Sequence, residues 1–221
     1  MLRGDSQAWQ LLPAVLDRAI DQDLNVVAWI YPDCPPLELS DERAWRFLTG
    51  YEQNSAGWNR WADCLVVNQI ASLDIAALAE AGGVETIAAA SWPAYRSNAE
   101  NRVLAILDRG TRGLVELADE RPVTLVAPVP ELQRSGSSCL TRMWRVTACD
   151  VDRATADDFV AESAQWLRTV ADDVPLIDLP PELCDDLTCS ATSYLDPTRL
   201  DARRVELLAP YFDGVFERLD Q

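Results

Sequence analysis

The chain has 221 residues, 48% of them apolar and 25% charged, which is typical of a globular protein with a sizeable core and not of a disordered chain. Its formal net charge of −17 disfavours nucleic acids and anionic membrane surfaces as partners, because both would repel it. The sequence holds no His, which excludes a Ser-His-Asp triad, a Cys-His dyad and a His-ligated metal or haem site made by this chain alone. We expect neither a metal nor a cofactor.

Helix and strand patterns alternate along the chain. Apolar residues recur at helical spacing from Ala8 to Ile20 and predict a first helix, and the mostly apolar run Leu24–Tyr31 predicts a strand. Residues 33–60 and 129–150 show no such pattern and are expected to be irregular. The later expected elements are, in chain order, a helix over about 64–81, a strand over Val84–Ser91, a helix over Glu100–Leu117, a strand over Val123–Ala127, a helix over Asp157–Val170, a strand over Val174–Leu179 and a last helix over about 201–219.

This alternation predicts a single α/β domain over residues 1–221, with a mostly parallel sheet and helices on both faces, as in flavodoxin-like three-layer folds. Short apolar strands lie between amphipathic helices, and no two-residue hairpin turn, repeat or change of composition interrupts them. Only three residues precede Gly4, so we expect the first strand to be truncated. Sites in such sheets lie beyond the carboxyl ends of the strands. The segments there are Gly4-Asp5-Ser6, Pro32–Pro36, Trp92–Tyr95, Pro128–Pro130 and Pro180–Arg199.

The sequence shows no membrane-spanning or targeting segment. A bilayer span needs about 18 or more apolar residues with few or no charges. The longest apolar-leaning region, Ile70–Trp92, is interrupted by Asp74, Glu80 and Glu85. No signal peptide is recognisable at the amino terminus. We therefore expect no direct membrane insertion of this chain.

The six cysteines leave two interpretations open. An even count favours disulfides, with 15 ways to pair six residues. No CxxC pair occurs, which disfavours a thioredoxin-type redox site and a structural zinc site. The alternative is six reduced, buried thiols in a cytosolic protein. Disulfides would instead indicate an oxidising compartment outside the cytoplasm. The residues are Cys34, Cys64, Cys139, Cys149, Cys184 and Cys189.

The tripeptide Gly4-Asp5-Ser6 stands directly before the first predicted helix. A small residue permits a tight strand-to-helix turn, and Asp5 is a favourable helix cap. Ser6 then lies at the positive end of the helix, where a developing oxyanion is stabilised. By itself the tripeptide is more typical of a simple helix cap than of a nucleophile.

Further motifs follow this tripeptide along the chain, and their order is more informative than the tripeptide alone. The chain opens with GDSQAWQLLPAVLD, and Cys64 is followed four residues later by Asn68. The other motifs are, in order, YPDCPPL, IAAASWPAY, APVPEL and LPPELCDDLTCSATSYLDPTRLDARRVELLAPYF. The series resembles, over nearly the whole chain, the SGNH domain, a GDSL-type hydrolase fold. In bacterial cell-surface O-acyltransferases this domain follows a membrane acyltransferase domain.

The resemblance implies a role for residues at both ends of the chain. The nucleophile of the family's GDS motif maps to Ser6, and its DxxH motif maps to Asp196-Pro197-Thr198-Arg199, so that Arg199 replaces the base His. Gln7 is a second departure, because family members usually have GDSH. Asp5, Asn68, Trp92 and Tyr95 are the candidates for the oxyanion hole or cleft. The two aromatic residues among them would either pack in the core or stack on substrate.

The resemblance also implies a location, partners and a disulfide pattern. Its enzymes move acyl groups onto or off glycans outside the cytoplasmic membrane. A glycan or acylated glycan is the expected partner. We expect sequence upstream of Met1 to encode the rest of the first strand and a tethering membrane acyltransferase domain. The implied cysteine pairs are Cys34–Cys64, Cys139–Cys149 and Cys184–Cys189.

The replacement of the base His leaves three hypotheses. The Arg199 guanidinium is always charged and cannot accept a proton, and an ordinary aspartate such as Asp196, with a pKa of about 3.9, is a poor base at neutral pH. The first hypothesis is O-acyl transfer or ester hydrolysis through Ser6, impaired by this loss. The second is a non-catalytic domain that binds a glycan or protein partner, with an Asp196–Arg199 salt bridge. The third is an unrelated flavodoxin-like binding domain.

Overall fold

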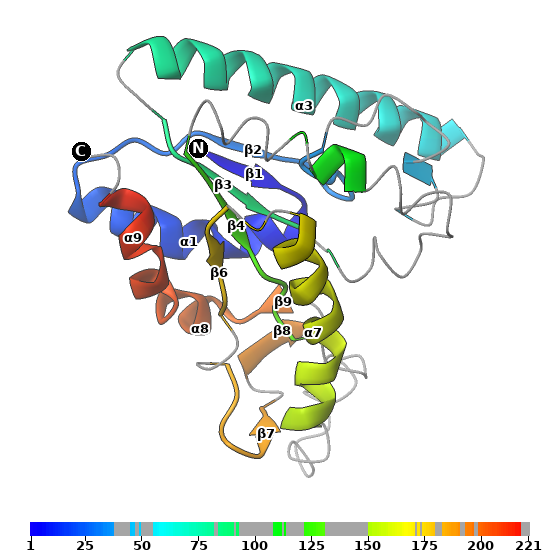
Figure 1. The fold of residues 1–221 in the computed structure, drawn as a ribbon, viewed down its shortest axis with the longest axis vertical. Helices are drawn as coiled ribbons and strands as arrows, with labels where there is room; N and C mark the ends of the chain where they lie inside the picture. The colour runs from blue at the N-terminus through cyan, green and yellow to red at the C-terminus, as the bar shows by residue number, and fades with distance from the viewer. Residues whose placement is uncertain are drawn as a thin grey trace.

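The fold centres on a five-stranded parallel sheet, seen in a computed structural model of the chain (Figure 1). The spatial order of the strands is β2-β1-β3-β4-β6, as the alternating pattern predicts for an α/β protein. The strands are β1 (Leu2–Gly4), β2 (Ala28–Ile30), β3 (Thr86–Ala89), β4 (Val123–Val126) and β6 (Leu176–Ile177). The structure describes residues 1–37, 45–46, 49, 55–81, 84–90, 92, 108–111, 113, 122–130, 150–170, 172, 174–179, 183–190, 193–196 and 199–217.

Helices cover both faces of the sheet. On one face, α1 (Ser6–Asp21) packs with short carboxy-terminal helices against residues such as Leu2 and Val126. On the other face, α3 (Ser55–Ala81) and α7 (Arg153–Val170) cover residues such as Leu125. Neighbouring residues of a strand point to opposite faces, which explains why Leu125 and Val126 belong to different clusters. The expected three-layer arrangement is therefore confirmed.

Several helix boundaries differ from those expected. Helix α3 begins at Ser55, inside the region expected to be irregular, and α7 begins at Arg153 rather than Asp157. The expected last helix is three short ones, namely α8 (Ala202–Glu206), the 3₁₀ helix η4 (Ala209–Phe212) and α9 (Asp213–Phe216). Pro210 lacks the N–H that a continuous helix needs, so the chain turns at Leu208 before η4.

The two edge strands of the sheet are shorter than the apolar runs that predict them. β2 and β6 keep three and two residues of the expected strands. Within the expected helix Glu100–Leu117, residues 108–111 and 113 are helical, and the rest lies outside the described residues. Residues 129 and 130 of the expected loop 129–150 carry no helix or strand, and its residues 131–149 are likewise outside that description.

Two small antiparallel ladders involve the segment that follows β6, where no strand was expected. β5 (Val151–Asp152) pairs with β7 (Thr188–Cys189), and β8 (Tyr194–Asp196) pairs with β9 (Arg199–Leu200). Only two residues separate β8 from β9, so the expectation of a chain without such hairpins is wrong here. Strands of two or three residues are too short to show alternating hydrophobicity, and this is why the pattern missed them.

Helix α3 is apolar on its outer side as well as on the side that faces the sheet. Within the described chain, its stretch Arg60–Leu78 has the length (19 residues) and the mean hydropathy (1.3) that would suffice to cross a membrane. The Cys34–Cys64 disulfide links this helix to the segment that follows β2. Membrane insertion would break this packing, and the expectation that the chain does not insert stays a prediction.

Candidate functional site

Ser6 is the first residue of α1, directly beyond the carboxyl end of β1, which lies between β2 and β3 in the sheet. Gly4 makes the tight turn between strand and helix with a φ of 149°, a conformation that L side chains rarely adopt. Asp5 caps the helix, because its Oδ1 accepts a hydrogen bond from the Gln7 backbone N–H at 2.8 Å. The Ser6 side chain is half-buried at the positive end of a 16-residue helix dipole.

The helix that begins with Ser6 is bonded to the strand that contains Arg199. The Oε1 atom of Gln10 accepts a buried hydrogen bond of 2.7 Å from the backbone N–H of Leu200. Gln10 lies one helical turn from Ser6, and Leu200 follows Arg199 in β9. The structure thus brings the segment that contains Ser6 close to the segment that contains Arg199, as the family resemblance implies. The backbones of Asp196 and Arg199 face each other in the β8–β9 ladder.

Asn68 is buried beside the Cys34–Cys64 disulfide, with all of its amide hydrogens engaged inside the protein. Its Nδ2 donates to the carbonyl oxygens of Pro35 and Leu37, both at 3.0 Å. Its Oδ1 accepts from Nη2 of the buried Arg3 at 3.1 Å. An amide NH₂ has two hydrogens, so this arrangement leaves no donor on Asn68 for an oxyanion.

Trp92 is a core residue. Its side chain is 0% exposed and packs against Trp166, with ring centroids 6.1 Å apart. Its Nε1 donates to the carbonyl oxygen of Val126 at 3.1 Å. A ring that stacks on substrate needs an accessible face, so the core-packing alternative applies to Trp92. Tyr95, the other aromatic candidate, lies outside the described residues.

Two disulfides are present in the described parts of the chain, Cys34–Cys64 and Cys184–Cys189, both as the resemblance implies. The implied third pair, Cys139–Cys149, lies outside those parts. Inside the second loop, backbone N–H groups of Thr188 and Leu187 donate to the Asp185 carboxylate and hold its pKa below the ordinary 3.8. Within the described residues, no three His, Cys, Asp or Glu side chains gather in a way that would hold a metal ion.

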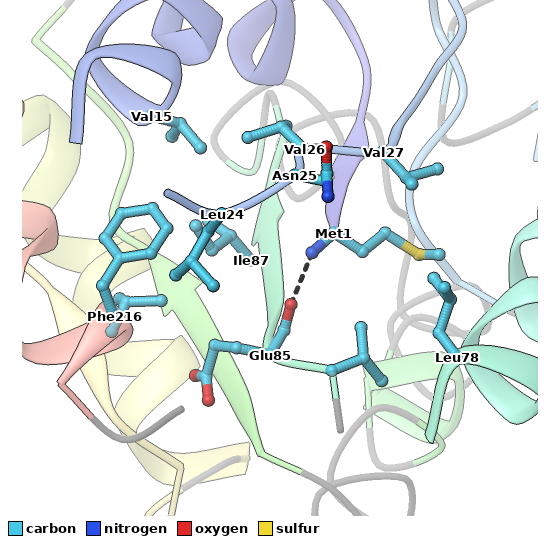
Figure 2. Close-up of a pocket in the computed structure, with 12 residues that line it drawn as sticks. Met1, Val15, Leu24, Asn25, Val26, Val27, Leu78, Glu85, Ile87 and Phe216 are labelled. Carbon is cyan, nitrogen blue, oxygen red and sulfur yellow. Dashed lines mark hydrogen bonds between the residues drawn. The ribbon is translucent and has the colours of Figure 1, made fainter. Parts of the chain in front are cut away.

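A cavity of about 290 Å³ lies at the opposite end of the sheet from Ser6 (Figure 2). Its walls are mostly apolar, and the Met1 nitrogen at its edge donates to the carbonyl oxygen of Glu85 at 2.5 Å. The cavity adjoins the amino ends of the strands, whereas ligands of such sheets bind at the carboxyl ends. We therefore place the candidate site at Ser6.

The parallel sheet, with a serine at the start of the helix that follows β1, has the α/β arrangement of the SGNH or GDSL-like fold. The family model described as the SGNH domain fused to AT3 domains matches residues 1–201. The chain therefore belongs to the SGNH domain family, as its ordered motifs suggest.

Solved structures of low sequence identity share this fold. The periplasmic domain of a lipopolysaccharide acetyltransferase from Salmonella ser. Paratyphi A is 14% identical and has a TM-score of 0.54, with 100% of this chain and 83% of that chain covered. A GDSL-like lipase from Bacteroides thetaiotaomicron VPI-5482 is 10% identical and has a TM-score of 0.50, with 98% and 86% covered. No curated protein matches the sequence. Identities this low establish the fold alone.

Proposed function

We propose that this domain handles O-acyl esters of cell-surface glycans, with Ser6 as nucleophile, and that its catalysis is impaired by the loss of the base His. The observation that carries the proposal is the position of Ser6 at the amino terminus of α1, in a chain that holds no His. Membership of the SGNH family supports the reaction class. The solved lipopolysaccharide acetyltransferase domain supports a glycan as acceptor or donor.

The chemistry requires a base beside Ser6. In ester cleavage the serine Oγ bonds to the carbonyl carbon, its proton passes to the base, and the alcohol leaves with a proton returned by that base. Water or a glycan hydroxyl then takes the acyl group from the serine. Arg199 holds the family position of the base, and a guanidinium does not accept a proton at neutral pH.

The parts of the site that remain provide binding and electrostatic stabilisation. The amino terminus of α1 directs backbone N–H groups and a positive dipole toward an oxyanion formed at Ser6. Removal of one triad member lowers kcat by a factor of about 10⁴ to 10⁶, and the residual rate comes from such groups. Slow acyl transfer is therefore the activity expected of the unmodified chain.

The proposed location is outside the cytoplasm, tethered to a membrane acyltransferase domain. The two disulfides support an oxidising compartment, and the family model is one of SGNH domains fused to AT3 domains. The genomic reading frame that contains this sequence tests the tether, because it should also encode several membrane spans. A reading frame that encodes no membrane spans would contradict it.

A non-catalytic role in glycan or partner binding is the second candidate. The absence of any His favours it, because binding needs no base. In this case Ser6→Ala leaves the binding of acylated glycans unchanged, and Arg199→His restores no chemistry. Glycan-array binding of the purified domain and of Ser6→Ala measures the difference.

A fluorophosphonate probe tests the role of Ser6 directly. We expect very slow labelling of Ser6 in the unmodified chain and faster labelling in Arg199→His, with a single ionisation near a pKa of about 6.5. Ser6→Ala in that background should abolish labelling. Arg203→His is the matched control, because it places an imidazole at an exposed position of α8. It should leave labelling unchanged.

Two results would contradict the proposal. Rapid labelling of Ser6 in the unmodified chain would show that another base operates and that catalysis is not impaired. No labelling of a folded Arg199→His variant would show that Ser6 is not a competent nucleophile.

A further inference from the structure

Gln7 and Gln10 form a buried pair of side-chain amides next to Ser6. They are 6% and 7% exposed and lie in the first two turns of α1. The Nε2 atom of Gln10 donates to the Oε1 atom of Gln7. This bond fixes which end of the Gln10 amide faces outward from the pair. The Oε1 atom of Gln10 is thereby directed at the backbone N–H of Leu200, from which it accepts at 2.7 Å.

The bond from Gln10 joins segments that are 190 residues apart in the sequence. Leu200 pairs with Tyr194 across the β8–β9 ladder, and Asp196 pairs with Arg199 in the same ladder. A two-residue strand makes few bonds of its own, so an anchor from outside the hairpin contributes strongly to its position. The hydrogen bond is buried, and its loss would leave the Leu200 N–H without this acceptor.

We propose that Gln10, oriented by Gln7, is a positioning residue that sets position 199 relative to Ser6. The inference rests on the proposed function of Ser6 and position 199. Ser6 and Gln10 are one helical turn apart, about 6 Å along the axis, so the anchor of β9 and the serine belong to one rigid element. A base must approach a serine Oγ to about 3 Å, and a displacement of about 1 Å lowers rates strongly. Gln10 acts through position 199 and does not touch the reacting atoms.

The proposal also gives Gln7 a role. Its backbone N–H bonds to the capping Asp5, and its side chain orients Gln10. The residue after Ser6 therefore connects the helix cap to the anchor of β9. This is a physical reason for an amide at the position where the family usually has His.

The test uses Arg199→His as background, because the chain holds no His and the variant carries a single imidazole. Gln10→Leu removes the acceptor for the Leu200 N–H at similar side-chain size. Gln10→Glu keeps an oxygen that can accept from the Leu200 N–H. The Gln7 amide can turn and donate to the second carboxylate oxygen of this glutamate. Thr124→Val is the matched control, since it removes a buried hydrogen bond to Glu85 at a site remote from Ser6.

We expect Gln10→Leu to lower fluorophosphonate labelling of Ser6 by at least about tenfold and to change the imidazole chemical shifts and pKa in NMR titrations. Gln10→Glu should retain most of the labelling, and Thr124→Val should change neither measurement in the folded protein. Unchanged imidazole shifts and labelling in Gln10→Leu would overturn the proposal.

The imidazole titration separates this inference from the proposed function. If Arg199→His is not labelled at all, the nucleophile assignment fails, and the NMR comparison with Gln10→Leu still decides whether Gln10 positions residue 199. Changed imidazole shifts there support the positioning role, and identical shifts reject it.

Discussion

Gly4 lies against the carbonyl oxygen of Ala89 so closely that no side chain fits between them. A Cβ atom added to Gly4 would be 1.7 Å from that oxygen and 2.8 Å from the Cβ of Ala8. The contact joins the turn before Ser6 to the carboxyl end of β3. The close approach therefore fixes where the nucleophile candidate stands relative to the sheet.

Gly4→Ala should destabilise the protein by at least about 3 kcal/mol, because it adds a clash with backbone atoms to a φ that alanine rarely adopts. Chemical denaturation followed by circular dichroism measures the free energy of unfolding. Gly214→Ala is the control, since Gly214 is exposed in α9 with no atom within 4 Å of an added Cβ. It should stabilise by about 0.5–1 kcal/mol. Equal effects of the two substitutions would contradict this account.

The two described disulfides should differ in their contribution to stability. Cys34–Cys64 closes a separation of 30 residues and Cys184–Cys189 one of 5. In the chain-entropy model, loops of these sizes correspond to about 3.6 and about 2 kcal/mol. Paired Cys→Ala substitutions followed by urea denaturation measure the difference. A larger loss from the short loop would indicate that lost packing, and not loop closure, dominates.

The third pair is checked by mass. Non-reducing peptide mapping should find Cys139 linked to Cys149 in protein made under oxidising conditions. Free thiols at both positions would reject that pair and leave the other two unaffected.

Acid should weaken the hydrogen bonds to Asp185, inside the Cys184–Cys189 loop, only at low pH. The backbone N–H groups of Thr188 and Leu187 favour the ionised Asp185, so the folded pKa lies below that of the unfolded chain. The stabilisation is fully present above the unfolded pKa of about 3.9 and is lost as the pH falls through the lower, folded pKa. NMR shifts of the Leu187 and Thr188 amides should titrate with a midpoint below 3.8. Asp185→Asn should abolish this titration, and Asp186→Asn should leave it in place.

The central architecture follows from local patterns in the sequence. Alternation of short apolar runs with amphipathic helices predicts the parallel sheet, and Gly4-Asp5-Ser6 predicts the turn and cap at the start of α1. The break in the last helix was missed, although Pro210 and Gly214 both disfavour a continuous helix. These features depend on residues close together in the chain.

The remaining parts of the site depend on contacts between distant residues. No local pattern indicates that Gln10 accepts a hydrogen bond from Leu200, or that Asn68 bonds to Arg3. The burial of Trp92 likewise depends on Trp166 in α7. Residue type alone made Asn68 and Trp92 plausible cleft residues, and only the folded chain shows which neighbours they contact.

Asn68 should prove to be a structural residue and not an oxyanion donor. Both Nδ2 hydrogens are donated to the Pro35 and Leu37 carbonyls, and Oδ1 accepts from Arg3, so one buried amide joins α3, β1 and the segment after β2. Asn68→Ala removes all three bonds and should lower the free energy of unfolding by about 2–4 kcal/mol, whereas Gln69→Ala, at the exposed neighbouring position, should change it by less than about 0.5 kcal/mol.

The labelling rate of Ser6 tests the oxyanion role of Asn68 directly. In the Arg199→His background, this rate per folded molecule should be the same whether residue 68 is Asn or Ala. An oxyanion donor would instead contribute a factor of about 10² to 10³ to that rate, since its hydrogen bond strengthens in the transition state. A loss of that size in folded Asn68→Ala protein would show that the amide turns toward the reacting carbonyl when substrate binds.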